Sequence, residues 1–393
     1  MAMIRPKTEM KDSGIEYLGK IPTTWGKCRL KNVCTSFNSN ITTAIINKEH
    51  GNYKIFGASG LIGYIEFETM QDEYLGIVKD GAGVGRIGSY PSHSSLLGTL
   101  AYIIPNDGIN MKWIKYVIEN MNLGESIDKT TIPHIYFSTY GNNYIPFPSP
   151  DEQRAIADYL DKTCFKIDEI IAEAKASIDE YKELKIGQIN KYTIHKMKRT
   201  KLKYITEKIG DEIHATPEYS DEGTIRFING GSFGEDSIKM IGPMLSNEEY
   251  QKQNKSLLNE HTVMIALNGA NFGNTSLYNN EAILLGKSAG YITLKSTVCR
   301  EYVRYCLENS VTKEAFDLSL NGTTIPNLSL NTLRNTEICL PDYSVQKQLA
   351  KTIKKMIIKM DSLIAEKESL INDLEAYKKS LIYEVVTGKR RVV

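Results

Sequence analysis

The sequence predicts an α+β protein in which two strand-rich α/β domains are separated by two long helices that form an antiparallel coiled coil. The first observation is an internal repeat: Pro148-Ser-Pro-Asp-Glu-Gln153-Arg-Ala-Ile-Ala157 returns 193 positions later as Pro341-Asp-Tyr-Ser-Val-Gln346-Lys-Gln-Leu-Ala350. Second, short β-branched and aromatic runs broken by Gly, Asn and Ser precede each copy, which is typical of strands. Third, a long proline-free segment begins in each copy. The repeat therefore relates two similar halves by a pseudo-two-fold.

The repeat divides the 393 residues into four segments. They are a first strand-rich domain (1–147), a first long helix (148–200), a second strand-rich domain (201–337) and a second long helix (338–393). The repeat also reaches back into the domains, because Thr130-Thr-Ile-Pro133 recurs as Thr323-Thr-Ile-Pro326. Solenoid repeats are far shorter, so the repeated unit is a whole domain with its helix.

Apolar residues in the two proline-free segments recur alternately three and four positions apart, which predicts a coiled-coil seam on each helix. At 1.5 Å per residue each helix would be roughly 60–70 Å long. We expect the two seams to face each other in an antiparallel pair, with Lys367 interrupting the second. The matched positions expected to face each other are Ile167, Ile171 and Ile178 in the first helix and Met360, Ile364 and Ile371 in the second. The alternative is that each helix packs only on its own domain. The seam residues are Leu160, Ile167, Ile171 and Ile178 in the first helix and Ile353, Met360, Ile364 and Ile371 in the second.

The composition is that of an ordinary globular chain, with 41% hydrophobic and 24% charged residues. No apolar run approaches the length of a membrane span, which predicts no membrane association. The six cysteines lack paired C-x-x-C spacing, so we expect reduced thiols in a cytoplasmic protein. The net charge of +1 argues against a chain that holds DNA by its phosphates alone.

No motif predicts an active site. Gly83-Val-Gly85-Arg-Ile-Gly88 fits G-x-G-x-x-G, but Pro91 follows closely where a dinucleotide loop requires a helix. The six histidines are scattered, and the chain has no phosphate-binding P-loop and no H-E-x-x-H motif. We therefore expect neither a metal nor a cofactor in this chain.

Several segments in order make the chain resemble the specificity subunit of type I restriction–modification enzymes. They are the opening Ile21-Pro22…Trp25…Leu30, the early Phe56-Gly-Ala-Ser-Gly60, the repeated Pro…Gln…Ala motif with its long helix, and the ending Ser380-Leu-Ile-Tyr-Glu-Val-Val-Thr-Gly388-Lys-Arg. The resemblance covers essentially the whole chain. The first helix departs from it, because it reads Gly187…Thr193-Ile-His195 where the second reads Ser380…Val386-Thr-Gly388. The copies therefore need not contact partners identically.

The resemblance implies that each strand-rich domain is a target recognition domain that reads one half of a bipartite, asymmetric site in double-stranded DNA. The helices would fix the gap between the half-sites and dock two methyltransferase (modification) subunits, which nuclease–translocase (restriction) subunits join. S-adenosylmethionine, ATP and Mg²⁺ are then expected in those partners. Two other hypotheses remain open: a coiled-coil scaffold whose domains bind proteins and no DNA, and an enzyme that acts alone.

Loops are the expected places for DNA contacts, because Arg, Lys, Asn and Thr side chains there can reach bases or phosphates. The matched glycine turns and the Thr-Thr-Ile-Pro turns are the best candidates. Since the threonines recur in both copies, they favour backbone contacts over base reading, or a structural role. In the first domain the candidates are Lys79, Arg86, Lys129, Thr130, Thr131 and His134. In the second they are Asn268, Asn271, Asn274, Asn321, Thr323, Thr324 and Asn327.

Overall fold

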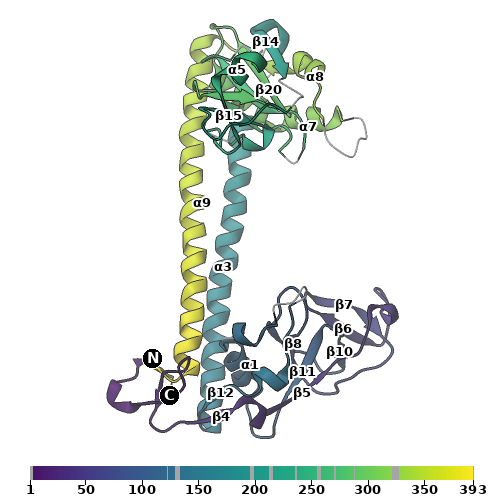
Figure 1. Cartoon of the computed structure of the whole chain (residues 1–393), viewed down its shortest axis with the longest axis vertical. Helices are drawn as coiled ribbons and strands as arrows, with labels where there is room; N and C mark the ends of the chain where they lie inside the picture. Colours follow the sequence, from purple (N-terminus) through teal and green to yellow (C-terminus); the bar gives the residue numbers. More distant parts are fainter. Residues whose placement is uncertain are drawn as a thin grey trace. The chain divides into compact units, whose positions relative to one another are not determined.

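The computed structural model describes residues 3–121, 123–128, 133–194, 199–211, 216–234, 237–254, 258–269, 271–286, 288–320 and 327–392. The chain forms two compact units. Unit 1 comprises residues 1–174 with 369–393, and unit 2 comprises residues 175–368. Each of the two long helices contributes one part to each unit (Figure 1).

Unit 1 contains two main sheets. The first is antiparallel throughout, and the second joins its first two strands in parallel. The four-stranded sheet has the order β5 (Cys34–Asn38), β11 (Leu100–Pro105), β8 (Tyr74–Val78) and β9 (Ile87–Tyr90). The three-stranded sheet has the order β10 (Ser94–Leu96), β6 (Tyr53–Gly57) and β7 (Gly60–Ile65).

Unit 2 repeats these two sheets with the same strand order and directions. The match confirms the internal repeat at the level of topology. The four-stranded sheet has the order β14 (Thr206–Asp211), β20 (Ala289–Leu294), β17 (Thr262–Ala266) and β18 (Thr275–Leu277). The three-stranded sheet has the order β19 (Ile283–Leu285), β15 (Ile225–Ile228) and β16 (Met244–Leu245).

An amphipathic helix packs on the four-stranded sheet of each unit: α1 (Met111–Glu119) and α6 (Arg300–Glu308). Large aromatic side chains are fully buried in both units, among them Trp113 and Tyr302. The smaller elements are β1 (Met3–Ile4), β2 (Met10–Asp12), β3 (Lys20–Pro22), β4 (Gly26–Arg29), α2 (Phe137–Tyr140), β12 (Tyr144–Phe147), β13 (Arg199–Lys201), α4 (Leu202–Ile205), α5 (Asn247–Gln253), α7 (Ser310–Leu318), α8 (Leu330–Asn335), β21 (Glu337–Cys339) and β22 (Arg390–Arg391).

The repeated Pro…Gln motif connects each domain to its long helix. Gln153 is fully buried; its amide nitrogen donates to the Pro148 carbonyl at 3.2 Å, and its Oε1 accepts from the Asn110 N–H at 3.1 Å. Gln346 donates to the Pro341 carbonyl at 2.7 Å and accepts from the Cys299 N–H at 2.9 Å. Since Asn110 and Cys299 precede α1 and α6, each glutamine holds the start of an amphipathic helix against the start of a long one.

The long helices are α3 (Pro150–Thr193) and α9 (Tyr343–Val386). Their seams are largely shielded from solvent, as expected. Met360 and Ile364 are half-buried. The other six seam residues are at most 9% exposed: Leu160, Ile167, Ile171, Ile178, Ile353 and Ile371.

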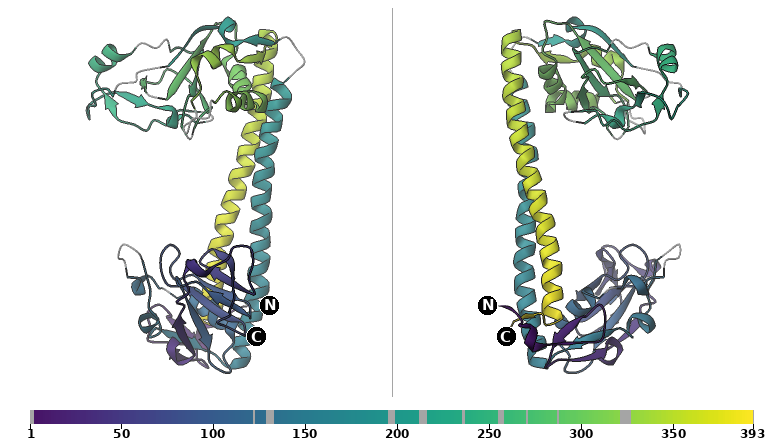
Figure 2. Two further views of the ribbon diagram at one scale, coloured as in Figure 1. Left: turned by 90° about the vertical axis from the view of Figure 1, so that its right-hand side faces the viewer. Right: turned by 60° about the vertical axis from the view of Figure 1, so that its left-hand side comes forward.

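In each unit an ion pair joins the two helices. In unit 1, Lys378 Nζ lies 2.7 Å from both carboxylate oxygens of Asp168. In unit 2, Lys185 Nζ lies 2.9 Å from Asp361 Oδ1. In unit 1, Val386 lines a small cavity with Ile145 and Pro146, just before α3 begins, while Lys378 pairs with Asp168 further along α3. The two helix segments of this unit are therefore antiparallel, and in each unit the segments lie side by side in both views (Figures 1 and 2). The helices therefore pack on each other as well as on their own domains.

One expectation about the seam is wrong. We expected Ile167, Ile171 and Ile178 to face Met360, Ile364 and Ile371. Counting on from the Asp168–Lys378 pair puts Ile171 opposite Leu374 and Glu375 instead. The physical reason is that numbering runs in opposite directions along an antiparallel pair. Ile171 and its repeat equivalent Ile364 therefore do not face each other.

The two ends of the chain meet in unit 1. Met3 and Ile4 of β1 pair with Arg391 and Arg390 of β22. Gly388 has a φ of +72°, and a Cβ there would lie 2.4 Å from Pro22 Cγ. Both the backbone conformation and the lack of space therefore require glycine. These contacts bring the opening motif (Ile21-Pro22) and the ending motif (Val386-Thr-Gly388) together in space. Among the described residues, no helix is both long and apolar enough to cross a bilayer.

Candidate nucleic-acid interface

The first glycine turn connects β8 to β9. The Val78 N–H donates to the Arg86 carbonyl at 2.8 Å, and the Gly85 N–H donates back to the Val78 carbonyl at 2.8 Å. Gly81 and Gly85 have φ values of +84° and +89°, which L side chains rarely adopt. The backbone therefore fixes a tight turn that leaves Lys79 at its entry and Arg86 at its exit.

The second copy builds the same turn between β17 and β18. The Ala266 N–H donates to the Asn274 carbonyl at 2.8 Å, and the Gly273 N–H donates to the Ala266 carbonyl at 2.9 Å. Gly269 and Gly273 again have positive φ, +80° and +76°. The two turns therefore share one backbone design although their side chains differ.

The structure brings each glycine turn against the segment that follows the Thr-Thr-Ile-Pro turn. In unit 1 the Ile135 N–H donates to the Lys79 carbonyl at 3.0 Å, and Asp80 forms a β-bridge with His134. In unit 2 the Leu328 N–H donates to the Leu267 carbonyl at 2.7 Å, and Asn268 bridges to Asn327. In each unit the glycine turn and the described residues after the Thr-Thr-Ile-Pro sequence thus form one surface. We call these surfaces cradle 1 (residues 79–86 and 133–135) and cradle 2 (residues 267–269, 271–274 and 327–330).

Cradle 1 is basic but partly self-paired. Lys79 Nζ lies 2.7 Å from Asp80 Oδ2, and the Lys79 side chain is 20% exposed. Arg86 Nη2 donates to the Ala58 carbonyl at 3.0 Å, which ties the turn to the β6–β7 hairpin. The His134 ring lies 3.4 Å from the Asp128 carboxylate and packs edge-on against Tyr136. DNA contact would therefore compete with carboxylates already present.

Cradle 2 is neutral and hollow. A cavity of about 310 Å³ lies beside the paired residues Asn268 and Asn327. Asn271 is partly buried and Asn274 is exposed on the turn itself. Amide side chains offer both donors and acceptors, so this surface can match the edges of bases without a formal charge.

Three polar residues that line this cavity were not among the candidates: Asp211, Ser288 and Ser329. Asp211 ends β14 and Ser288 precedes β20, so sheet pairing places them there. Ser288 has a φ of +71°, which for a non-glycine residue indicates a constrained turn. Only a knowledge of the strand order would have nominated them. Six candidates lie outside the described residues: Lys129, Thr130, Thr131, Asn321, Thr323 and Thr324.

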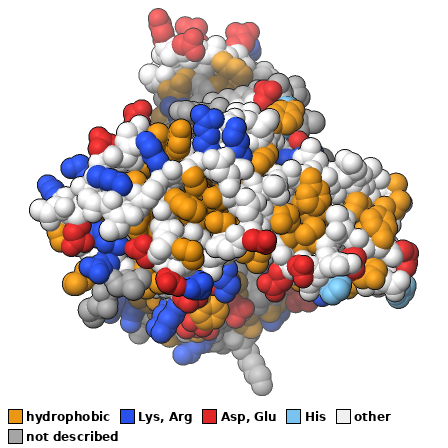
Figure 3. All heavy atoms as spheres, turned by 90° about the horizontal axis from the view of Figure 1, so that it is seen from below, with side chains coloured by type: hydrophobic (Ala, Val, Ile, Leu, Met, Phe, Trp, Pro, Cys, Tyr) orange, Lys and Arg blue, Asp and Glu red, His pale blue; other side chains and the backbone are white. Residues whose placement is uncertain are grey.

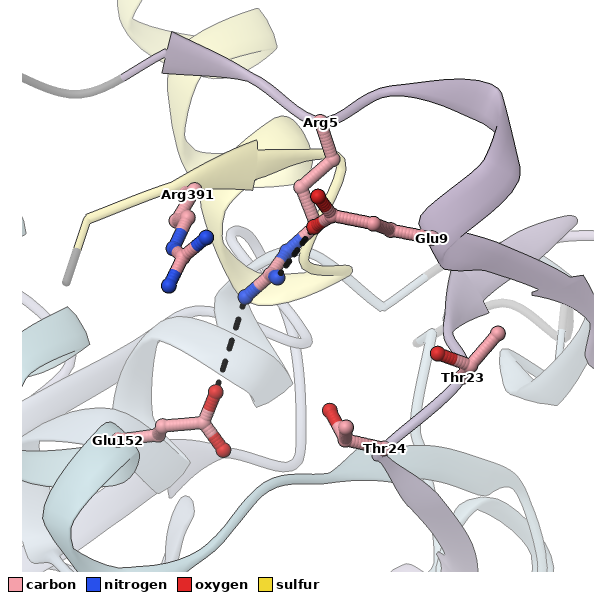
Figure 4. A pocket seen from close by; sticks show the side chains of 6 residues that line it. All are labelled: Arg5, Glu9, Thr23, Thr24, Glu152 and Arg391. Atoms are coloured by element: carbon pink, nitrogen blue, oxygen red, sulfur yellow. Dashed lines mark hydrogen bonds and ion pairs between the residues drawn. The ribbon is translucent and has the colours of Figure 1, made fainter.

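A separate cavity lies where the chain ends meet, and it is not a binding candidate. Figure 4 shows the Arg5 guanidinium between Glu9 and Glu152, with Arg391 directed toward the same space. Arg5 lies 3.5 Å from Glu9 and 3.6 Å from Glu152. Two arginines therefore face two glutamates, and this balance leaves no excess positive charge for an anion.

The titratable groups do not suggest catalysis. Burial raises the pKa of the Cys28 thiol to about 11 and that of the Cys34 thiol to about 12. Thiols with such pKa values stay protonated near neutral pH and are poor nucleophiles. Throughout the described part of the chain, no cluster of three His, Cys, Asp or Glu residues could hold a metal ion. The face shown in Figure 3 interleaves basic and acidic side chains, in keeping with the near-neutral net charge.

Comparison with known proteins decides the family. A family model described as "Type I restriction modification DNA specificity domain" matches residues 22–180 and again 185–373. The chain belongs to this family. The two matches coincide with the two halves of the internal repeat, as the resemblance implied.

Curated relatives agree with this assignment. The chain is 25% identical over 305 residues to the type I restriction enzyme MjaVIII specificity subunit of Methanocaldococcus jannaschii, covering 70% of each protein. It is 21% identical to the MjaIX specificity subunit of the same organism, covering 100% of this chain and 99% of the relative.

Solved structures share the fold. One chain from a study of complex assembly in a type I restriction–modification system has a TM-score of 0.73 at 14% identity, covering 94% of this chain and 99% of that one. The HsdS subunit from Thermoanaerobacter tengcongensis has a TM-score of 0.55 at 13% identity, with 94% and 98% covered. This protein is therefore a DNA specificity subunit with two recognition domains, and its role in the enzyme is recognition without catalysis.

Proposed function

We propose that cradle 1 and cradle 2 each read one half of a bipartite, asymmetric sequence in double-stranded DNA. The observation that carries the proposal is that one backbone design holds two different sets of side chains. Lys79, Asp80 and His134 in unit 1 correspond to Leu267, Asn268 and Asn327 in unit 2. Equal scaffolds with unequal side chains suit two half-sites of different sequence.

The chemistry of the cradles supports different reading modes. Arg86 can donate two hydrogen bonds to a guanine once it leaves the Ala58 carbonyl, and His134 can contact a phosphate or a base. Asn268 and Asn327 can each pair with an adenine edge, and the Asp211 carboxylate can accept from the amino group of a cytosine. Unit 2 therefore reads mainly through amides and one carboxylate, where unit 1 uses cations.

The test is to map methylation in the assembled enzyme that carries Asn327→Ala. We expect one position of one half-site to become degenerate, with about 1–3 kcal/mol less discrimination there and the other half unchanged. Asn331→Ala is the control, because Asn331 is exposed on α8 and does not line the cavity. An unchanged recognition sequence would reject cradle 2 as the reading surface. An assembled complex without any sequence preference in DNA binding would favour the protein-binding scaffold.

We further propose that the helix pair docks two modification subunits on equivalent surfaces. Exposed apolar side chains follow one edge of each helix at intervals of seven residues or their multiples, beside the seam. Leu184 of α3 is 50% exposed, and its repeat equivalent Tyr377 of α9 is 48% exposed. The other members are Ile170 and Leu370, which are 44% and 38% exposed. The repeat thus places one member of the matched pair in each unit, Tyr377 in unit 1 and Leu184 in unit 2, which fits two copies of one partner.

Single and double substitutions test this docking. We expect Leu184→Glu or Tyr377→Glu to leave one modification subunit bound and the double variant to leave none, because a carboxylate in an apolar contact stays desolvated and unpaired. Native mass spectrometry of the complex gives the stoichiometry. Lys175→Glu, at an exposed position on α3, is the control. Two bound subunits in the double variant would contradict the proposal. Restriction subunits would join this core, with S-adenosylmethionine, ATP and Mg²⁺ acting in the partners.

A further inference from the structure

The first half of α9 carries an unbroken run of positive charge. Between Asp342 and Asp361 the sequence contains five lysines and no acidic residue. All five are exposed, and all lie in unit 2. Four of them are spaced four residues apart, so they form a row along the outer side of the helix. The five are Lys347, Lys351, Lys354, Lys355 and Lys359, which we call the lysine row.

The lysine row has no internal charge partner. Over the described ranges, no ion pair links any of its members to a carboxylate, and Lys347 contacts only the ring of Tyr343, at 4.8 Å. Like charges four residues apart destabilise a helix, so the row has a cost that the fold does not offset. Asp361, the nearest carboxylate along the helix, already pairs with Lys185.

The internal repeat shows that the helix itself does not require these lysines. The equivalent stretch of α3 mixes both signs, with Asp158 and Asp161 beside Lys162. There, Lys112 Nζ and the Tyr116 hydroxyl both contact the Asp161 carboxylate, at 2.7 and 2.8 Å. In α9 the position equivalent to Asp161 is Lys354. The two copies share seam and length but differ in charge at this face, so the row serves something outside the helix pair.

We propose that the lysine row binds the sugar–phosphate backbone of duplex DNA, outside the two cradles. This inference rests on the proposed DNA readout. The row from Lys347 to Lys359 spans about 18 Å at 1.5 Å per residue. Duplex DNA carries one phosphate per about 1.7 Å of axis, so several phosphates lie within reach of the row.

The chemistry favours phosphates over an acidic protein segment. Lysine is a point charge on a flexible stem, which suits evenly spread phosphates and carries no sequence information. The row holds no arginine for bidentate pairing with carboxylates. Ile358 is the exposed aliphatic residue among the lysines, 53% exposed, and can lie against deoxyribose. With a net charge of only +1 for the chain, this row is where counterion release would be concentrated.

The experiment measures the salt dependence of DNA binding by the full chain assembled with its modification subunits. The plot of log K against log salt loses about 0.9 in slope for each phosphate contact removed. We expect K347Q/K351Q/K355Q/K359Q to flatten the slope by about two to four, equally on specific and non-specific DNA. The matched pair is K355Q/K359Q against K162Q/K166Q, since Lys162 and Lys166 are the repeat equivalents on α3. The α9 pair should flatten the slope by about one to two and the α3 pair by less than half of that.

The outcomes separate the inference from the proposed function. An unchanged slope in the quadruple variant, with normal half-site recognition, rejects the proposal that the lysine row binds DNA. The proposal that the cradles read the half-sites is then unaffected. Equal effects of the two matched pairs also reject the proposal for the lysine row. Loss of a modification or restriction subunit with the DNA slope intact assigns the row to a protein partner and rejects the inference. If Asn327→Ala leaves recognition unchanged while the lysine variants still flatten the slope, the cradle proposal fails and the row stands.

Discussion

At the residue scale, the residues repeated most faithfully are internal supports. Gln153 and Gln346 are buried, and each satisfies a strand-end carbonyl and a helix-start N–H. The sequence alone shows that these glutamines are repeated, but not which groups they contact. The hydrogen bonds to the helix-start N–H groups join residues more than forty positions apart, and such a partner cannot be read from local pattern.

Gln346→Ala should destabilise the protein by about 2–4 kcal/mol, because it leaves the Cys299 N–H and the Pro341 carbonyl without partners in a buried site. Gln348→Ala, two residues along the same helix and exposed, should change stability by less than about 0.5 kcal/mol. Urea unfolding followed by circular dichroism measures both. Equal midpoints for the two variants would show that the buried amide is dispensable.

For the candidate loops, the sequence predicts the backbone turns but not the side-chain partners. Glycine spacing predicted both turns, since positive φ at Gly81 and Gly269 admits few other residues. The partners of the candidates were not predicted. Lys79 pairs with its own neighbour Asp80, and Asp211 reaches the cavity beside cradle 2 only because β14 lies beside β20. Base-reading residues need distances in three dimensions, which turn chemistry alone does not supply.

At the element scale, the two ion pairs between the long helices are repeat equivalents of each other. Asp168–Lys378 and Asp361–Lys185 are exchanged by the repeat, and both lysines occupy seam positions. Heptad spacing predicted helices α3 and α9 almost to their ends, because the same 3–4 alternation runs through both. It did not predict which residues meet across the pair, since a seam has the same pattern in either direction.

A double-mutant cycle tests the pairing. We expect coupling energies of about 0.2–1 kcal/mol for Asp168→Asn with Lys378→Met and for Asp361→Asn with Lys185→Met. The second should be the larger, because Lys185 is 14% exposed and Lys378 is 26% exposed. The crossed combination of Asp168→Asn with Lys185→Met is the control, since these residues belong to different pairs. Coupling in the crossed combination as large as in the matched ones would refute the antiparallel register.

At the scale of the whole molecule, the repeat makes the recognition domains exchangeable. Replacing residues 28–145 with the first domain of another family member should change only one half of the methylated sequence. The junctions are favourable, because Cys28 and Ile145 are directly paired neighbours in the β4–β12 ladder. Methylation mapping before and after the exchange checks the result. A change in both halves, in a normally assembled complex, would end the modular interpretation.

The helix pair should act as a spacer between the half-sites. Inserting one heptad between Ala174 and Lys175, and another between Ile371 and Asn372, keeps the seam in phase and the ion pairs intact, since counting on from the ion pairs puts these junctions opposite each other. Each helix lengthens by about 10 Å, which corresponds to about three base pairs of DNA. We expect both half-site sequences to persist with a longer gap, or activity to be lost if the modification subunits cannot span it. Full activity on the original gap would contradict the spacer role.

The make-up of unit 1 also has a consequence for biosynthesis. Residues 175–368 hold all of unit 2, whereas unit 1 needs residues 369–393 as well as the first 174. On the ribosome, unit 2 can therefore be complete while the earlier-made unit still lacks its share of α9 and β22. Unit 1 therefore emerges first but completes its fold last. Until residues 369–393 emerge, the seam of α3 from Leu160 to Ile171 has no α9 partner to cover it. Selection on translation speed and chaperone access would act most strongly on that interval.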